Sequence, residues 1–79
     1  LFIMQNLQVA SCIKTLCKKN NITINSLIEN CKLTKSFIYD MEKRDKTPSV
    51  DRLERIADYF DVSLDYLVGR TDNPNSHKS

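Results

Sequence analysis

Polar groups able to form directed hydrogen bonds lie close together between residues 34 and 40. Lys35 and Ser36 are adjacent, and Tyr39 and Asp40 follow one helical turn later, so a helix would present all four on one face. A lysine can donate to guanine O6 or N7, and a serine hydroxyl can donate to a base or accept from it. We therefore interpret Lys35 and Ser36 as candidates to read base edges in a DNA major groove, with Tyr39 and Asp40 beside them on the same face. The alternative is an ordinary solvated start to a helix.

Two neighbouring side chains admit different roles. Asp40 would be repelled by phosphates unless it accepted a hydrogen bond from a cytosine amino group. Its alternative is local pairing with Lys43 or Arg44, and both readings stay open. Phe37 is expected to pack between helices rather than to stack on a base.

A second group of candidates could hold the sugar-phosphate backbone. The cations of residues 43–46 follow the predicted helix directly, and Pro48 ends their loop because proline disfavours helical geometry in the residue before it. Thr23 and Thr34 are predicted N-caps, and helix N-termini bind anions through free amides. The predicted DNA contacts are Thr23, Asn25, Thr34, Lys35, Ser36, Tyr39, Asp40, Lys43, Arg44 and Lys46.

Catalysis and metal binding find no support in the sequence. The single histidine, His77, lies in the C-terminal segment, and a chain with one glycine has no glycine-rich phosphate loop. Cys12, Cys17 and Cys31 form no C-x-x-C pair, and we interpret them as reduced, buried or half-buried thiols, which favours the cytoplasm. No enzyme activity, metal or cofactor is expected.

Charge is distributed unevenly, although the net charge is only +2. Residues 14–46 carry eight Lys or Arg against four acids, whereas residues 51–72 carry three Arg against six acids. Phosphate attracts the first segment and repels the second. The basic half is therefore the one able to meet a nucleic acid.

Helical periodicity predominates, and no alternating strand pattern of useful length occurs. A first helix is predicted from about Asn6 to Lys19, ended by Asn20 and Asn21, because Asn tolerates the left-handed conformation of a helix C-cap. A second, short helix follows Thr23 and closes near Asn30. The apolar face of the first helix is predicted to be Leu7, Ala10, Ile13, Leu16 and Cys17.

Three further helices complete an all-α bundle of five. Each is expected to begin after a hydroxyl N-cap, whose oxygen accepts from a free amide of the first turn. The predicted caps are Thr34, Ser49 and Ser63, and the predicted ends are near Lys43, near Phe60 and just before Gly69. The expected buried cluster is Ile13, Leu16, Leu27, Leu33, Ile38, Met41, Leu53, Ile56, Phe60 and Leu67.

Three segments are expected along the chain. Residues 1–5 form an N-terminal extension, whose apolar start is too short for a signal peptide or a membrane span. Residues 6–70 form the folded domain. Residues 71–79 lack periodic apolar residues and are expected to form a flexible C-terminal tail.

Three patterns in register resemble the Xre-type helix-turn-helix family, to which the phage lambda-type repressor DNA-binding domains belong. They are the segment 22–42, the Pro48-Ser49 start of the fourth helix, and the segment 56–72 with its Val-Ser-Leu-Asp-Tyr-Leu run. The resemblance implies a five-helix, lambda-repressor-like DNA-binding domain. Its helix-turn-helix would comprise the second and third helices, and the third would enter the major groove.

Four positions depart from the usual residues of that family. The first is Ile24, which takes the place of a glutamine that often bonds a phosphate or a neighbouring recognition side chain in relatives. Lys32 and Arg44 stand where glycine is common at turns, so a positive φ is expected at both, with a charge gained near the phosphate path. Cys17 replaces an arginine that pairs in many relatives with the residue equivalent to Glu42. Glu42 is therefore expected to pair with Lys14, to bond a backbone amide or to stay hydrated.

The resemblance implies a sequence-specific transcriptional regulator, expected to be a repressor, either complete in this chain or the N-terminal part of a longer protein. The alternative is a protein-interaction module of the same fold, such as the antitoxin of a toxin–antitoxin pair. The expected partner is a double-stranded DNA operator with an inverted repeat, bound by a homodimer, because one recognition helix reads only a few base pairs. The dimer contact is expected at Leu64, Tyr66, Leu67 and Val68, with residues 1–4 as the second choice.

Overall fold

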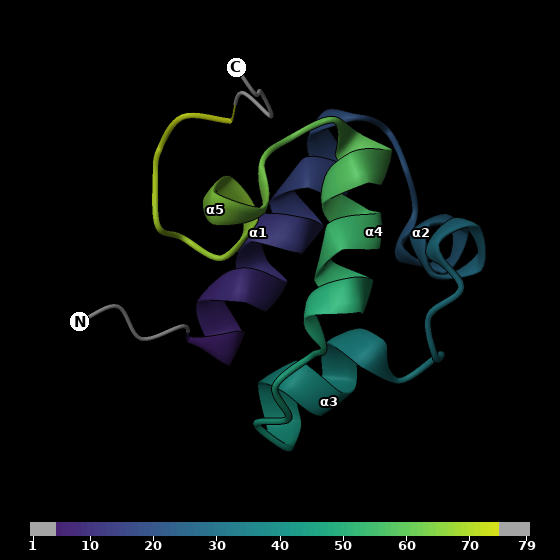
Figure 1. Cartoon of the computed structure of the whole chain (residues 1–79). Helices are drawn as coiled ribbons and strands as arrows, with labels where there is room; N and C mark the ends of the chain where they lie inside the picture. The colour runs from purple at the N-terminus through teal and green to yellow at the C-terminus, as the bar shows by residue number, and fades with distance from the viewer. Residues whose placement is uncertain (1–4, 75–79) are drawn as a thin grey trace.

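Five short helices enclose a single apolar core in the computed structural model of the chain, which describes residues 5–74. Figure 1 shows α4 in front of α1, with α2 on one side, α5 on the other and α3 across one end. No strand occurs in the described range, so the all-α, five-helix prediction is confirmed. The helices are α1 (Asn6–Lys19), α2 (Ile24–Cys31), α3 (Phe37–Lys43), α4 (Val50–Phe60) and α5 (Leu64–Leu67).

Hydroxyl caps start three of the helices as predicted. The side chains of Thr23, Ser49 and Ser63 accept hydrogen bonds from backbone amides in the first turns of α2, α4 and α5, at 3.0, 3.2 and 3.0 Å. Gly69 follows α5 with φ +89°, a conformation that suits glycine, and its amide donates to the Tyr66 carbonyl.

The predicted start of the third helix was wrong by two residues. Lys35 and Ser36 form a turn, and α3 begins at Phe37 with Ser36 as its N-cap. Thr34 acts through its backbone carbonyl, which accepts from the Phe37 amide at 3.0 Å. This bond joins residues three apart, whereas the bonds of an α-helix join residues four apart. Residues 34–37 therefore form a tight turn, and the α-helix starts only after it.

The predicted core is largely confirmed, with corrections at its edges. Leu33 and Phe60 are only partly buried and pack against the cluster from outside. Leu7 is 65% exposed, and Val9, at 1%, takes its place in the core. At 3.6 residues per turn, Leu7 projects well away from the side of α1 that carries Val9 and Ile13.

Positive φ angles mark the turns, but not at every predicted position. Lys32 adopts φ 57° as expected from its place in the turn. Arg44 has φ −109°, so the prediction was wrong there, and the left-handed residue is the next one, Asp45, with φ 52°. Asn21, with φ 56°, follows α1 as predicted.

The segment after α5 stays attached to the domain for part of its length. The Ser63 amide donates to the Pro74 carbonyl at 3.0 Å, and the Asn73 amide donates to the Thr71 hydroxyl at 3.1 Å. The predicted flexible tail is therefore held against the start of α5 as far as Pro74. Its remainder, and the apolar residues 1–4, lie outside the described residues.

Candidate nucleic-acid interface

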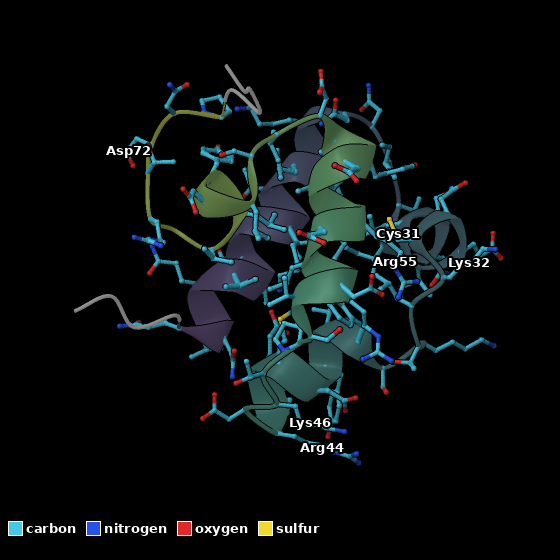
Figure 2. The ribbon with its side chains drawn as sticks, viewed as in Figure 1. Cys31, Lys32, Arg44, Lys46, Arg55 and Asp72 are labelled. Carbon is cyan, nitrogen blue, oxygen red and sulfur yellow. The ribbon has the colours of Figure 1, made fainter. Side chains whose placement is uncertain are left out.

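The predicted DNA contacts lie in one continuous segment that runs from the start of α2 to the loop after α3. All are exposed except Asp40, which is partly buried. Figure 2 shows Arg44 and Lys46 at the α3 end of the molecule and Asp72 at the other end. Thr23 and Asn25 lie at the start of α2, Thr34, Lys35 and Ser36 in the turn, Tyr39, Asp40 and Lys43 on α3, and Arg44 and Lys46 in the loop.

Asp40 is paired within its own helix. The Ser36 hydroxyl donates to Asp40 Oδ2 at 3.0 Å, and the Arg44 guanidinium lies 3.6 Å from Oδ1. The second contact is an ion pair too long for a hydrogen bond, which leaves Oδ1 without a hydrogen-bond partner. Local pairing with Arg44, one of the two predicted readings, is thus formed. It offsets the negative charge that would otherwise repel phosphate.

Arg44 also stacks over an aromatic ring. Its guanidinium carbon lies 5.6 Å from the centroid of the Tyr39 ring, within the range of a cation–π contact. Tyr39 and Asp40 therefore restrain Arg44 from two sides while its side chain stays 65% exposed. The cation is held at the surface and remains available to an anion.

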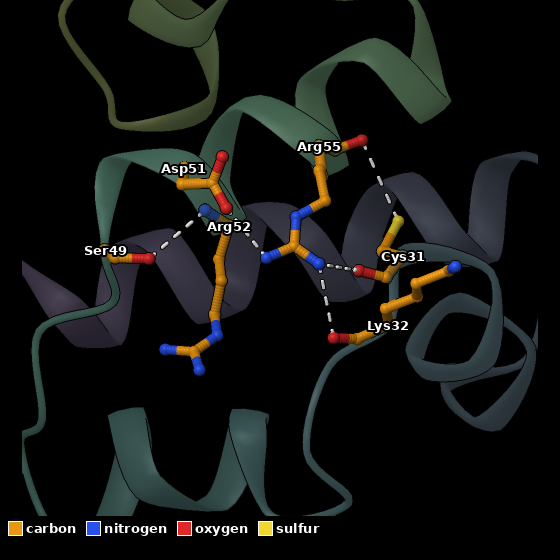
Figure 3. Close-up of polar contacts among 6 residues, drawn as sticks. All are labelled: Cys31, Lys32, Ser49, Asp51, Arg52 and Arg55. Carbon is orange, nitrogen blue, oxygen red and sulfur yellow. Dashed lines mark hydrogen bonds and ion pairs between the residues drawn. The ribbon is translucent and has the colours of Figure 1, made fainter.

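Arg55 on α4, which was not among the predicted site residues, fixes the end of α2. Its guanidinium donates to the backbone carbonyls of Cys31 and Lys32 at 2.9 and 3.3 Å, and to Asp51 at 2.9 Å (Figure 3). The Cys31 thiol returns a contact to the Arg55 carbonyl at 3.8 Å. These bonds satisfy carbonyls that the end of a helix leaves free, and they place the turn that leads to α3. The only feature of the sequence that could have indicated this role is the position of Arg55 next to the apolar residues of α4.

A second tether joins α3 to α1. Lys14 Nζ lies 2.6 Å from Glu42 Oε2, so the expected pairing of Glu42 with Lys14 is confirmed. The pair is partly exposed, and it takes the place of the arginine contact that the family resemblance implied at Cys17. Phe37 is buried, which confirms its predicted packing between helices.

A small hollow of about 140 Å³ borders the candidate interface. Figure 3 shows the Arg52 side chain extending toward α3, away from Arg55. The described residues place no acid in ion-pair contact with Arg52, so its charge is open to solvent and to a ligand. In the sequence Arg52 lies within the acidic segment 51–72, so it was not predicted as a DNA contact. The hollow is lined by Thr34, Phe37, Asp40, Met41, Lys46, Thr47, Pro48 and Arg52.

The predicted dimer contact needs a correction at Leu67. This side chain is 0% exposed and belongs to the core, so it has no surface to offer a second chain. A helix of one turn has few positions with which to hold itself to the bundle, and Leu67 is the one fully buried. Leu64, Tyr66 and Val68 are partly buried and retain some exposed surface.

The cysteines are free thiols inside or at the edge of the core. Cys17 and Cys31 are buried and Cys12 is partly buried. Desolvation by burial raises the pKa of all three thiols above the ordinary value of 9.0. Residues 5–74 contain no group of three His, Cys, Asp or Glu side chains placed to hold a metal ion. None of the described helices has the length and apolar character needed to cross a bilayer.

The five-helix fold, with polar groups exposed before and along α3 and cations in the loop after it, defines a DNA-binding domain of the helix-turn-helix class. The chain belongs to the Xre-type helix-turn-helix family, since the family model described as helix-turn-helix matches residues 13–67. It is 35% identical over 63 residues to the uncharacterized HTH-type transcriptional regulator YobD of Bacillus subtilis (strain 168). That match covers 80% of this chain and 56% of YobD, so the chain spans little more than half of that relative.

A solved structure agrees with the family assignment. The N-terminal DNA binding domain of SinR from Bacillus subtilis superposes with a TM-score of 0.68 and 26% sequence identity. The superposition covers 77% of this chain and 90% of the SinR chain, so the shared fold extends over nearly the whole SinR domain.

Proposed function

We propose that this chain is the DNA-binding part of a transcriptional regulator, and that it reads double-stranded DNA through the major groove with the turn before α3 and the exposed face of that helix. The observation that carries the proposal is the set of exposed polar and charged side chains between Thr23 and Lys46. It presents hydrogen-bonding groups next to cations, on helices held by Arg55 and by the Lys14–Glu42 pair.

Sequence reading is assigned to the turn and the first half of α3. Lys35 and Ser36 precede the helix and are exposed, so their side chains can reach base edges when α3 enters the groove. Tyr39 lies next on the same side and can contact bases or the sugar-phosphate backbone. Asp40 is assigned to holding Ser36 and Arg44 rather than to reading a base, because both neighbours already engage its carboxylate.

Phosphate contacts are assigned to both sides of the reading helix. The N-terminus of α2, with Thr23 and Asn25, offers free amides and polar side chains, and the loop after α3 offers Arg44 and Lys46. Arg52 borders the hollow beside Thr34 and Lys46 and adds a cation to the same side. Such contacts fix the orientation of a domain on the duplex without reading sequence.

Regulation is proposed to follow from occupancy of a site near a promoter, as a repressor that blocks polymerase. The relative YobD is named an HTH-type transcriptional regulator, which supports this class of function.

Two substitutions separate base reading from phosphate binding. Lys35→Ala should relax preference at one base position and cost about 1–3 kcal/mol on the preferred site only. Lys46→Ala should weaken binding to all sequences alike and reduce the salt slope by about one. Selection of preferred sites from random duplexes, followed by fluorescence anisotropy titrations at several salt concentrations, measures both effects.

The matched control is Arg70→Ala, which removes one exposed positive charge from the acidic half of the chain. It should leave preference unchanged and alter affinity far less than Lys46→Ala does. If Lys35→Ala kept the base preference of the original protein, the assignment of the reading surface would be wrong.

A further inference from the structure

We propose that Asn6, at the start of α1, is a positioning residue for DNA binding, which holds the loop of residues 44–47 so that Arg44 and Lys46 meet the phosphate backbone. The inference rests on the proposed function. The Asn6 side chain bonds none of the predicted DNA-binding residues, so it would affect DNA binding only through the position of the loop.

The side chain of Asn6 crosses from one end of the sequence to the loop after α3. Its Nδ2 donates to the Asp45 carbonyl at 3.1 Å, to Asp45 Oδ1 at 2.9 Å and to Thr47 Oγ1 at 3.3 Å. Two amide hydrogens are thus shared among three acceptors on the loop. Asn6 is 7% exposed and is the only buried polar residue in the described part of the chain.

The loop is bonded from the other side by α3. The Lys46 amide donates to the Asp40 carbonyl at 3.0 Å, and the Arg44 amide donates to the same carbonyl at 3.1 Å. Between these two bonds Asp45 takes the left-handed conformation, which costs free energy for a residue with a Cβ. Two of the three Asn6 bonds fall on Asp45, so they stabilise the conformation that sets the directions of Arg44 and Lys46.

Burying an asparagine side chain at the start of α1 costs more free energy than burying an apolar side chain of similar size. Its Oδ1 is buried and has no hydrogen-bond partner, so the side chain is half unsatisfied. An aliphatic residue at this end of α1 would avoid that cost. The gain must therefore come from the Nδ2 donor, and every hydrogen bond it forms goes to the loop.

The test combines amide exchange with a double-mutant cycle. In Asn6→Ala, hydrogen exchange at the Lys46 amide should speed up while exchange in the middle of α4 stays nearly unchanged. Affinity for preferred and random duplexes should fall equally, by about threefold to tenfold, the worth of one or two hydrogen bonds. Asn6→Ala and Lys46→Ala should be non-additive, because a freed loop no longer aims the cation, whereas Asn6→Ala and Lys35→Ala should be additive.

Thr47→Val is the milder companion variant, since it removes one acceptor of Asn6 at an exposed position. It should shift exchange and affinity in the same direction by a smaller factor. Strict additivity in the Asn6–Lys46 cycle, or unchanged exchange at the Lys46 amide, would overturn the positioning role.

Failure of the DNA proposal would give a different pattern. Lys35→Ala and Lys46→Ala would each leave affinity unchanged, while exchange at the Lys46 amide would still rise in Asn6→Ala. That result would support the tether and overturn its use in DNA binding.

Discussion

Lys32 ends α2 in the left-handed conformation, with φ 57°, just before the turn that leads to α3. A residue with a Cβ loses roughly 1 kcal/mol in this conformation relative to glycine. The conformation persists because the Arg55 guanidinium bonds the Lys32 carbonyl and because the Leu33 amide donates to the Ile28 carbonyl at 2.9 Å. At this position a lysine supplies a cation beside the helix-turn-helix at the expense of stability.

Replacing Lys32 with glycine should therefore stabilise the domain. We expect Lys32→Gly to raise the free energy of unfolding by about 0.5–1 kcal/mol, measured by urea denaturation followed by circular dichroism. Arg44→Gly is the matched comparison, because Arg44 has φ −109° and gains nothing from glycine. Equal stabilisation by both substitutions would contradict the conformational explanation.

Among the elements, the packing of α4 against α2 fixes the end of α2, from which the turn to α3 departs. Arg55 supplies hydrogen bonds to two backbone carbonyls at the end of α2, and Asp51 orients its guanidinium from one turn earlier on α4. α2 has only eight residues, so its own helical hydrogen bonds are few and its end depends on outside partners.

Loss of the Arg55 contacts should loosen the helix-turn-helix. Arg55→Met keeps the aliphatic stem, and we expect it to lower the free energy of unfolding by about 1–3 kcal/mol, as carbonyls at the end of α2 lose a charged donor. Arg52→Met on the same helix is the control for stability, since Arg52 is exposed and makes no ion pair within residues 5–74. Thermal unfolding of the two variants, measured under the same conditions, tests this role. Equal unfolding midpoints for Arg55→Met and Arg52→Met would refute it.

Most elements could be predicted from apolar spacing and capping hydroxyls, which act within a few residues. Two features that were missed depend on partners far along the chain, and a third depends on a local backbone bond. The positive φ expected at Arg44 falls on Asp45, where Asn6 bonds the loop from 39 residues away. The role of Arg55 requires the end of α2 to lie beside α4, which no local pattern reports. The start of α3 was placed too early because Thr34 has a residue type that suits a cap, while its carbonyl performs the bonding.

At the scale of the whole molecule, the buried thiols link stability to pH. Burial raises the pKa of Cys17 and Cys31 above 9.0, so each thiol resists ionisation in the folded state more than in the unfolded state. The stabilisation is fully present below the unfolded pKa and is lost progressively as pH rises from there through the higher folded pKa. We expect the free energy of unfolding, measured under reducing conditions, to fall above about pH 9.

The Cys17→Ala, Cys31→Ala double variant should show a shallower fall over the same pH range, whatever its absolute stability. Each thiol can contribute a slope of up to about 1.4 kcal/mol per pH unit. Parallel curves for the variant and the original chain would show that other groups cause the loss.

We expect two chains to bind one palindromic operator, since a single reading helix covers too few base pairs to select a site. The contact is proposed at the exposed parts of Leu64, Tyr66 and Val68, and its small size predicts a free protein that is partly monomeric. Sedimentation with a duplex of two half-sites should give two chains per duplex. Val68→Arg should reduce cooperativity and leave the affinity for one half-site intact. A saturated complex of one chain per palindrome would refute the dimer.

The two ends of α4 carry opposite electrical character. Its first turn adjoins the loop with Arg44 and Lys46, whereas its second half borders a hollow of about 650 Å³ whose lining includes Glu54, Asp58, Asp61 and Asp65. An 11-residue helix holds the two regions apart over a length of about 16 Å. In the field of a polyanion, such a molecule experiences a torque that turns its cationic end forward during approach. Encounters should therefore be productive more often than random collisions, with an association rate above about 10⁶ M⁻¹s⁻¹ that falls as ionic strength rises.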